Sequence, residues 1–346
     1  MSEVAIVGVD LAKRVFQVHG AAANGEVLFR KRLTRSQFVS FYKRLAPCAF
    51  AMEACATAHY WARELEKYGH QPRLIAPVFV RPFVKRQKND AADAEAIVEA
   101  ALRPTMRSVA PKSQEQQSRA MLFRTRDLLV GQRTQLINAL RGHMAEFGHT
   151  VAAGAAHVHR LSEVLEEKEN GLPPMVSELV WLYLRQIEQV TAQIEALKRQ
   201  IDRVAGESSM AGRLQTMPGI GPIGALAIES FVPDIRMFRK GRDFAAWLGL
   251  VPRQHSTGGK QWLGATSRAG QRDIRRLLII GATAVIRWAA RKEASAGTWL
   301  GRMLAKKPRK LVAVALANKM ARRIWQCLSK MLIKNESYRD PVGQPS

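Results

Sequence analysis

Short apolar runs separated by polar turns organise the chain up to Val109. A run rich in β-branched residues predicts a strand at residues 4–9, and short apolar or alternating runs predict strands at residues 15–19, 26–33, 48–52 and 72–76. Helical spacing of apolar residues predicts helices at residues 34–45, 58–68 and 90–102. Because a strand meander comes first and strands then alternate with helices, we expect an α/β domain here.

Two long helices are predicted to follow, and the second carries a heptad pattern. Helical spacing extends from Ser113 to Phe147, and a stretch rich in Gly and Ala then interrupts it. Apolar residues next recur in alternating steps of four and three, at Val176, Val180, Tyr183, Ile187, Val190, Ile194, Leu197, Ile201 and Val204. This series is typical of a coiled coil, and a helix packed on its own domain would show it too.

The remainder of the chain is predicted to be mainly helical and basic. We therefore expect an α/β domain (1–112), a long-helix or coiled-coil segment (113–207), a helical domain (208–334) and a frayed tail (335–346).

The charge of the chain indicates a polyanionic partner. Lys and Arg number 54 against 29 Asp and Glu, which gives a formal net charge of +25. So large a charge is typical of nucleic-acid binding, although a solvated basic surface would also produce it. The scattered cysteines suggest neither a zinc site nor disulfides, and no signal peptide or membrane-length apolar stretch is visible, so we expect a cytoplasmic protein.

Four carboxylates stand where the predicted α/β pattern would bring them together. Asp10 and Glu53 each end an apolar strand, and Asp90 and Asp93 lie three apart at the start of a predicted helix. Strand carboxyl ends converge on one edge of such a sheet, where a hard cation such as Mg²⁺ would offset the repulsion. Each residue alone could be a turn or helix cap. As an ordered set they resemble the RNase H or RuvC-like fold.

Two further segments are candidates for contacts with a nucleic-acid backbone. Arg86 and Lys88 precede the Asp pair, where a solvated basic face is the alternative interpretation. The segment around Gly219 and Gly221 resembles the turn of a helix-hairpin-helix, whose backbone N–H groups can approach a phosphate. A close-packed helix turn would use the same glycines.

The stretch QHSTGGKQ places Ser256 beside two glycines and a lysine. From the residues alone it is a polar turn, a phosphate cradle or the site of a serine nucleophile. His255 is a poor candidate base, because adjacent side chains rarely converge. The nearby cations that could hold a phosphate are Arg253, Lys260, Arg268, Arg272, Arg275 and Arg276.

Taken in order, the carboxylates, the PGIG turn and LVPRQHSTGG resemble the DEDD insertion-sequence transposases, over roughly residues 4 to 330. These have a RuvC-like N-terminal domain and a serine-bearing C-terminal domain, and are also described as bridge-RNA-guided or seeker-RNA-guided recombinases. The resemblance implies Mg²⁺ on the four carboxylates, and it implies a covalent phosphoserine formed on DNA. It also implies a structured non-coding RNA, and a nucleoid-associated homo-oligomer (dimer or tetramer) held by the coiled coil.

Ser256 is the nucleophile that we choose, and Thr257 is the alternative, because family members vary in the spacing before the serine. A second functional class stays open. A RuvC-like nuclease of the junction-resolvase type would use the carboxylates, and Ser256 would only bind phosphate. A non-catalytic nucleic-acid-binding protein is disfavoured, because all four carboxylates are present.

Overall fold

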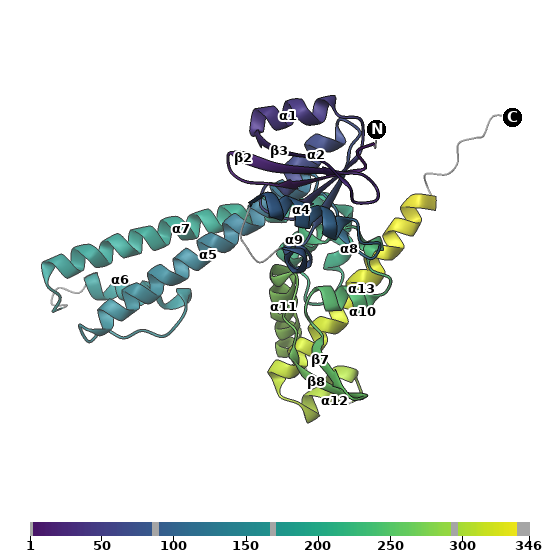
Figure 1. Ribbon diagram of the computed structural model, residues 1–346. Helices are drawn as coiled ribbons and strands as arrows, with labels where there is room; N and C mark the ends of the chain where they lie inside the picture. Colours follow the sequence, from purple (N-terminus) through teal and green to yellow (C-terminus); the bar gives the residue numbers. More distant parts are fainter. Residues whose placement is uncertain (1–2, 85–89, 167–170, 292–296, 338–346) are drawn as a thin grey trace. The chain divides into compact units, whose positions relative to one another are not determined.

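The computed structural model describes residues 3–84, 90–166, 171–291 and 297–337 (Figure 1). The chain divides into two compact units, Met1–Glu115 and Gln116–Ser346. The side chains of Asp90, Ala91 and residues 332–337 also lie outside this description.

The first unit is built on a sheet of order β3-β2-β1-β4-β5-β6. Its strands are β1 (Ile6–Asp10), β2 (Val15–Ala21), β3 (Val27–Thr34), β4 (Ala49–Glu53), β5 (Gln71–Ile75) and β6 (Ser108–Val109). The first three form an antiparallel meander, β1, β4 and β5 run parallel, and β6 is antiparallel to β5. The predicted meander with alternating elements is confirmed; the short β6 was not expected.

Helices cover both faces of this sheet, as the alternation of strand side chains requires. The helices are α1 (Arg35–Arg44), α2 (Ala58–Glu66), α3 (Pro77–Val80), a 3₁₀ turn η1 (Arg81–Phe83) and α4 (Asp90–Ala101). One apolar cluster joins residues such as Val9 and Met52 to α1 and α2, and another joins Ala49 and Ala51 to α4. Thr34 begins α1 with a capping box, as its spacing before Gln37 favours.

The second unit begins with long helices. They are α5 (Gln114–Ala145), a 3₁₀ turn η2 (Ala155–His157), α6 (His159–Glu166) and α7 (Pro174–Glu207). A buried cluster joins α5, α6 and α7, and the helices lie side by side in Figure 1. Val180 and Ile187 of the heptad series belong to this cluster, beside Ile137 and Leu140 of α5. This part of the seam is therefore covered within the chain, and a coiled coil between protomers is not confirmed.

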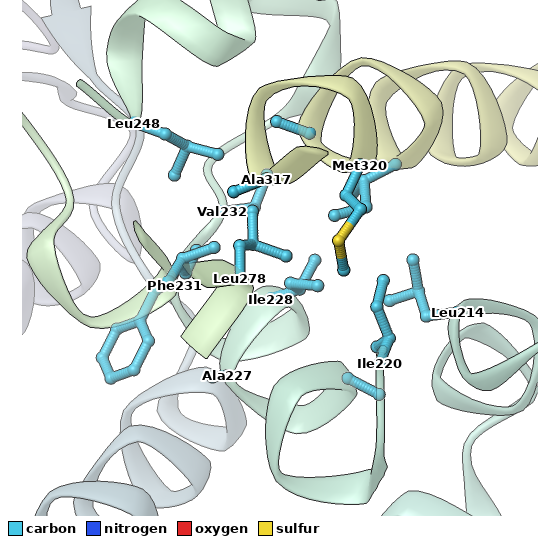
Figure 2. Packing of buried hydrophobic residues seen from close by; sticks show 14 of the residues in the cluster. Leu214, Ile220, Ala227, Ile228, Phe231, Val232, Leu248, Leu278, Ala317 and Met320 are labelled. Atoms are coloured by element: carbon cyan, nitrogen blue, oxygen red, sulfur yellow. The ribbon is translucent and has the colours of Figure 1, made fainter. Parts of the chain in front are cut away.

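The rest of the unit packs around α9. Its elements are α8 (Ser209–Gln215), α9 (Pro222–Phe231), η3 (Ile235–Met237), α10 (Gly241–Trp247), β7 (Pro252–Thr257), β8 (Lys260–Thr266), α11 (Arg272–Arg291), α12 (Trp299–Lys306) and α13 (Arg309–Ser337). Figure 2 shows Ile228 and Val232 packed among Leu278 of α11 and Ala317 and Met320 of α13. This core confirms the predicted helical character. The prediction missed the β7–β8 hairpin, which contains the whole QHSTGGKQ stretch.

Candidate functional site

Two of the predicted carboxylates stand side by side at the end of neighbouring strands. Strands β1 and β4 run parallel with Val9 opposite Met52, so Asp10 and Glu53 are the next residue of each strand. Both are half-buried. The sequence placed them at strand ends, and the parallel register brings them to the same edge of the sheet.

A glycine lets α4 approach this pair closely. A Cβ added at Gly8 would lie only 2.5 Å from the Ala94 carbonyl oxygen and 2.5 Å from Val98 Cγ2, so only glycine fits beneath the helix. Because alternate strand residues share a face, Asp10 faces α4 as Gly8 does. Ala51 packs against α4, and Glu53, two residues further along the same strand, therefore faces α4 too. The two strand carboxylates and α4 are therefore on one side of the sheet.

The charge of Asp93 on α4 acts on the carboxyl of Glu53. Burial raises the pKa of the Glu53 carboxyl, the charge of Asp93 raises it further, and Arg81 lowers it. Asp93 is therefore near enough to Glu53 for their charges to interact, and its helix lies on the side of the sheet that Asp10 faces. Asp90 begins α4, but its side chain lies outside the described residues, as do Arg86 and Lys88 entirely.

Asp10, Glu53 and Asp93 are suited to a hard divalent cation. Carboxylate oxygens are the ligands that such an ion prefers, and a cation would offset the repulsion that raises the pKa of Glu53. Across the side chains that the structure describes, no group of three His, Cys, Asp or Glu already has metal-binding geometry. Asp90, the expected fourth ligand, is not among those side chains.

The second candidate region, the β7–β8 hairpin, presents Ser256 to solvent. Every residue of β7 is exposed. Gly258 and Gly259 have φ of 57° and 77°, as a two-residue type I′ turn requires. A glycine pair between two extended runs is the sequence signal that would have revealed this hairpin.

The strand pairing separates neighbouring residues onto opposite faces. Ser256 pairs with Gln261, whereas Thr257 pairs with Lys260 and His255 with Trp262. Ser256 and Gln261 therefore share one face, and the other two pairs share the opposite face. This geometry removes His255 as a base for Ser256, as the sequence indicated, and it separates the two candidate nucleophiles.

Arg275 fixes the base of the hairpin. Its guanidinium donates to the carbonyl oxygens of Leu248 (2.9 Å) and Ala269 (2.8 Å), which lie on either side of the two strands. Burial, then the charges of Arg272 and Arg268, lower the pKa of this group, so three guanidinium groups are crowded together. We expected Arg275 to bind phosphate; its hydrogen bonds to the backbone indicate a positioning role.

The other predicted cations differ in how they are engaged. Arg253, Lys260, Arg268 and Arg272 are exposed. Arg276 forms an ion pair with Asp127 of α5. The first four are therefore the better placed to meet an anion.

The predicted PGIG turn joins α8 to α9 and is tightly packed. Gly219 has φ of 87°, and a Cβ added there would lie 2.9 Å from the Gly281 carbonyl oxygen. A Cβ at Gly281 would lie 2.0 Å from the Gly219 carbonyl oxygen. These contacts support the packing interpretation for Gly219. Gly221, at the N-cap of α9, is exposed with open space around it, so it remains a candidate for backbone contact with phosphate.

Within the described part of the chain, no helix is long and apolar enough to cross a membrane.

Comparisons with known proteins match the chain to transposases. A family model described as Transposase IS116/IS110/IS902 family matches residues 211–296, and a DEDD-type IS110 transposase model matches residues 7–148. The chain is 48% identical to the "Probable family 20 transposase" of Pseudomonas aeruginosa, over 94% of this chain and 96% of that protein.

Two further relatives are named for the elements that carry them. The transposase for insertion sequence element IS1328 of Yersinia enterocolitica is 40% identical, over 94% of this chain and 97% of that protein. The transposase for insertion sequence element IS1111A of Coxiella burnetii is 38% identical, over 98% of this chain and 92% of that protein. The chain therefore belongs to the IS116/IS110/IS902 family of insertion-sequence transposases.

Proposed function

We propose that the protein is a Mg²⁺-dependent DNA recombinase that cuts and rejoins DNA through a phosphoserine at Ser256. The family supports DNA as the substrate. The observation that supports the proposal is the register that sets Asp10 beside Glu53, on the face of the sheet covered by α4 and within reach of the charge of Asp93. The order of this sheet suggests an RNase H-like or RuvC-like fold.

The carboxylates would hold the metal and organise the phosphate to be cut. Asp10, Glu53, Asp93 and, from the sequence, Asp90 would supply the oxygen ligands. Bound Mg²⁺ would stabilise the charge that develops on phosphate oxygens during the transfer. Close packing at Gly8 fixes the distance from α4 to the strand pair, so the ligand geometry depends on the fold of this unit.

Ser256 would carry the covalent step. Its Oγ attacks the phosphorus, an Oγ–P bond forms, and the bond from phosphorus to the leaving deoxyribose oxygen breaks. The Oγ proton passes to water, and the leaving oxygen becomes a hydroxyl. Attack by another DNA hydroxyl on the phosphoserine then restores the serine and joins the new strands. The exposed guanidinium groups of Arg268 and Arg272 would neutralise the phosphate.

We extend the proposal to a guide RNA and a composite site. The resemblance to guided recombinases and the charge of +25 support binding of a structured non-coding RNA as well as DNA. The carboxylates and Ser256 belong to different units of the chain. A homo-oligomer in which one protomer's carboxylates meet the serine of another is consistent with that separation.

The proposal is tested by a denaturant-resistant protein–DNA adduct. Wild-type protein with its RNA, cognate DNA and Mg²⁺ should form the adduct, and Ser256→Ala should not. Thr257→Val is the matched control, because Thr257 points to the opposite face of the hairpin, and it should keep the adduct. Nicks with free hydroxyl ends and no adduct in wild type would identify a nuclease of the junction-resolvase type instead.

A further inference from the structure

The β7–β8 hairpin is exposed to solvent on both faces. All of β7 is exposed, as is β8 up to Ala265. A two-stranded ribbon without a packed face is only marginally stable in water. The hydrogen bonds of Arg275 hold the base of this ribbon, and the chain after β8 packs so closely that a Cβ at Gly270 would lie 1.8 Å from the Trp247 carbonyl oxygen.

Two large apolar side chains project from this ribbon. Trp262 is 68% exposed and Leu263 is 73% exposed. Successive strand residues alternate, so Trp262 shares its face with His255, Thr257 and Lys260, whereas Leu263 lies on the face of Ser256. Gly264, two residues beyond Trp262, leaves the neighbouring position on the Trp262 face without a side chain.

The charge around Trp262 favours an anionic partner. Residues 252–276 contain six basic side chains and a single acidic one, Asp273. Lys260 lies on the same face as the indole. An exposed aromatic ring beside cations is the combination by which proteins hold single-stranded nucleic acid, because the ring stacks on a base and the cations follow the phosphates.

We propose that Trp262 stacks on an unpaired base of the DNA substrate, on the face of the hairpin opposite to Ser256. This inference rests on the proposed function, since it takes the DNA held at this hairpin to be the DNA that Ser256 attacks, with the stacked base on the other face of the ribbon. Base faces are accessible to an indole only where stacking is broken, so the substrate is opened near the cleavage position. Ser256 pairs with Gln261 and Trp262 with His255, so the two groups lie one residue pair apart on the ribbon.

Binding of a single-stranded and a double-stranded oligonucleotide of the same sequence tests the proposal. Fluorescence anisotropy should show Trp262→Ala weakening single-strand binding about 5- to 100-fold, with a much smaller loss for the duplex. Trp262→Phe should retain most of the affinity. Trp181→Ala is the matched control, because Trp181 is a 42%-exposed tryptophan on α7, and it should bind as wild type does.

A second readout detects the stacking itself. A duplex with one unpaired 2-aminopurine should lose fluorescence on binding wild type, and the quenching should be absent with Trp262→Ala. Equal losses on duplex and single strand would indicate groove binding and overturn the proposal. A loss confined to RNA of the same sequence, or a changed sedimentation coefficient with unchanged DNA affinity, would also overturn it. Wild-type protein that binds neither DNA form would reject the proposed function itself.

Discussion

At the scale of single residues, the ionised carboxyl of Glu53 lowers the stability of the folded protein, and a bound cation would remove this effect. Its carboxyl is half-buried and close to Asp93, and its pKa in the folded protein is raised. A raised folded pKa means that the ionised form is less favourable in the folded than in the unfolded chain. Glu53 therefore reduces stability as the pH rises above its ordinary pKa, unless a cation offsets the charge.

Glu53→Gln should therefore raise the melting temperature at neutral pH in the presence of EDTA, because the uncharged amide does not repel Asp93. Mg²⁺ should raise the melting temperature of wild type by more than that of the variant. Glu66→Gln, an exposed position on α2, is the control and should change neither value. A variant that is less stable in EDTA, or one that gains as much from Mg²⁺ as wild type, would contradict this role.

Arg268 destabilises the fold in a different way, through backbone strain. It has φ of 54°, the left-handed region that glycine or asparagine usually occupies. Its backbone N–H donates to the Gly249 carbonyl oxygen at 3.2 Å, which holds the residue there. An arginine stands where a glycine would be less strained. Its guanidinium is exposed, which fits a role in contacting a phosphate of the DNA.

Arg268→Gly should separate stability from binding. Relief of the left-handed strain should leave the free energy of unfolding unchanged or raised by about 1 kcal/mol. DNA affinity should fall, and the slope of log K against log salt should become shallower by about 0.7 to 0.9, the value of one phosphate contact. Arg268→Lys should keep most of the affinity. Chemical denaturation and a salt titration measure both effects; unchanged DNA binding by the glycine variant would refute the phosphate contact.

At the scale of elements, the sequence predicted the carboxylate edge well and the hairpin poorly. Asp10, Glu53 and α4 were predictable because buried strands and amphipathic helices leave strong periodic patterns. Strands β7 and β8 bury neither face, so no alternation marks them, and only Gly258 and Gly259 signal the turn.

The other differences between the sequence-based predictions and the structure come from tertiary contacts. The heptad series of α7 fits a coiled coil equally well, but α5 covers part of its stripe within the chain. The hydrogen bonds of Arg275 depend on two loops coming together, which spacing along the chain does not reveal.

A pair of variants on α7 tests where protomers could meet. Ile187 is buried against α5, so Ile187→Asp should unfold the helical hairpin, with a loss of several kcal/mol. Leu182 is 44% exposed and lies on one helical stripe with the exposed Leu179 and Met175. If this stripe holds an oligomer, Leu182→Lys should reduce the sedimentation coefficient while circular dichroism stays unchanged. An unchanged oligomer would exclude the stripe as the contact.

At the scale of the whole molecule, the chain combines two chemically different units. One unit supplies half-buried carboxylates beside α4, and the other supplies an exposed serine among cations. The proposed reaction needs both, because the metal organises the phosphate and the serine retains the cut strand.

The most direct test of this account is to locate the DNA on the protein. Trypsin cuts after Arg253 and Lys260, so it releases a heptapeptide, residues 254–260, that contains both Ser256 and Thr257. After nuclease digestion of the adduct, tandem mass spectrometry should find a nucleotide joined through its phosphate to the Ser256 Oγ. The adduct should be absent when Glu53→Gln protein is used. A nucleotide on Thr257, or on a peptide elsewhere in the chain, would contradict the account.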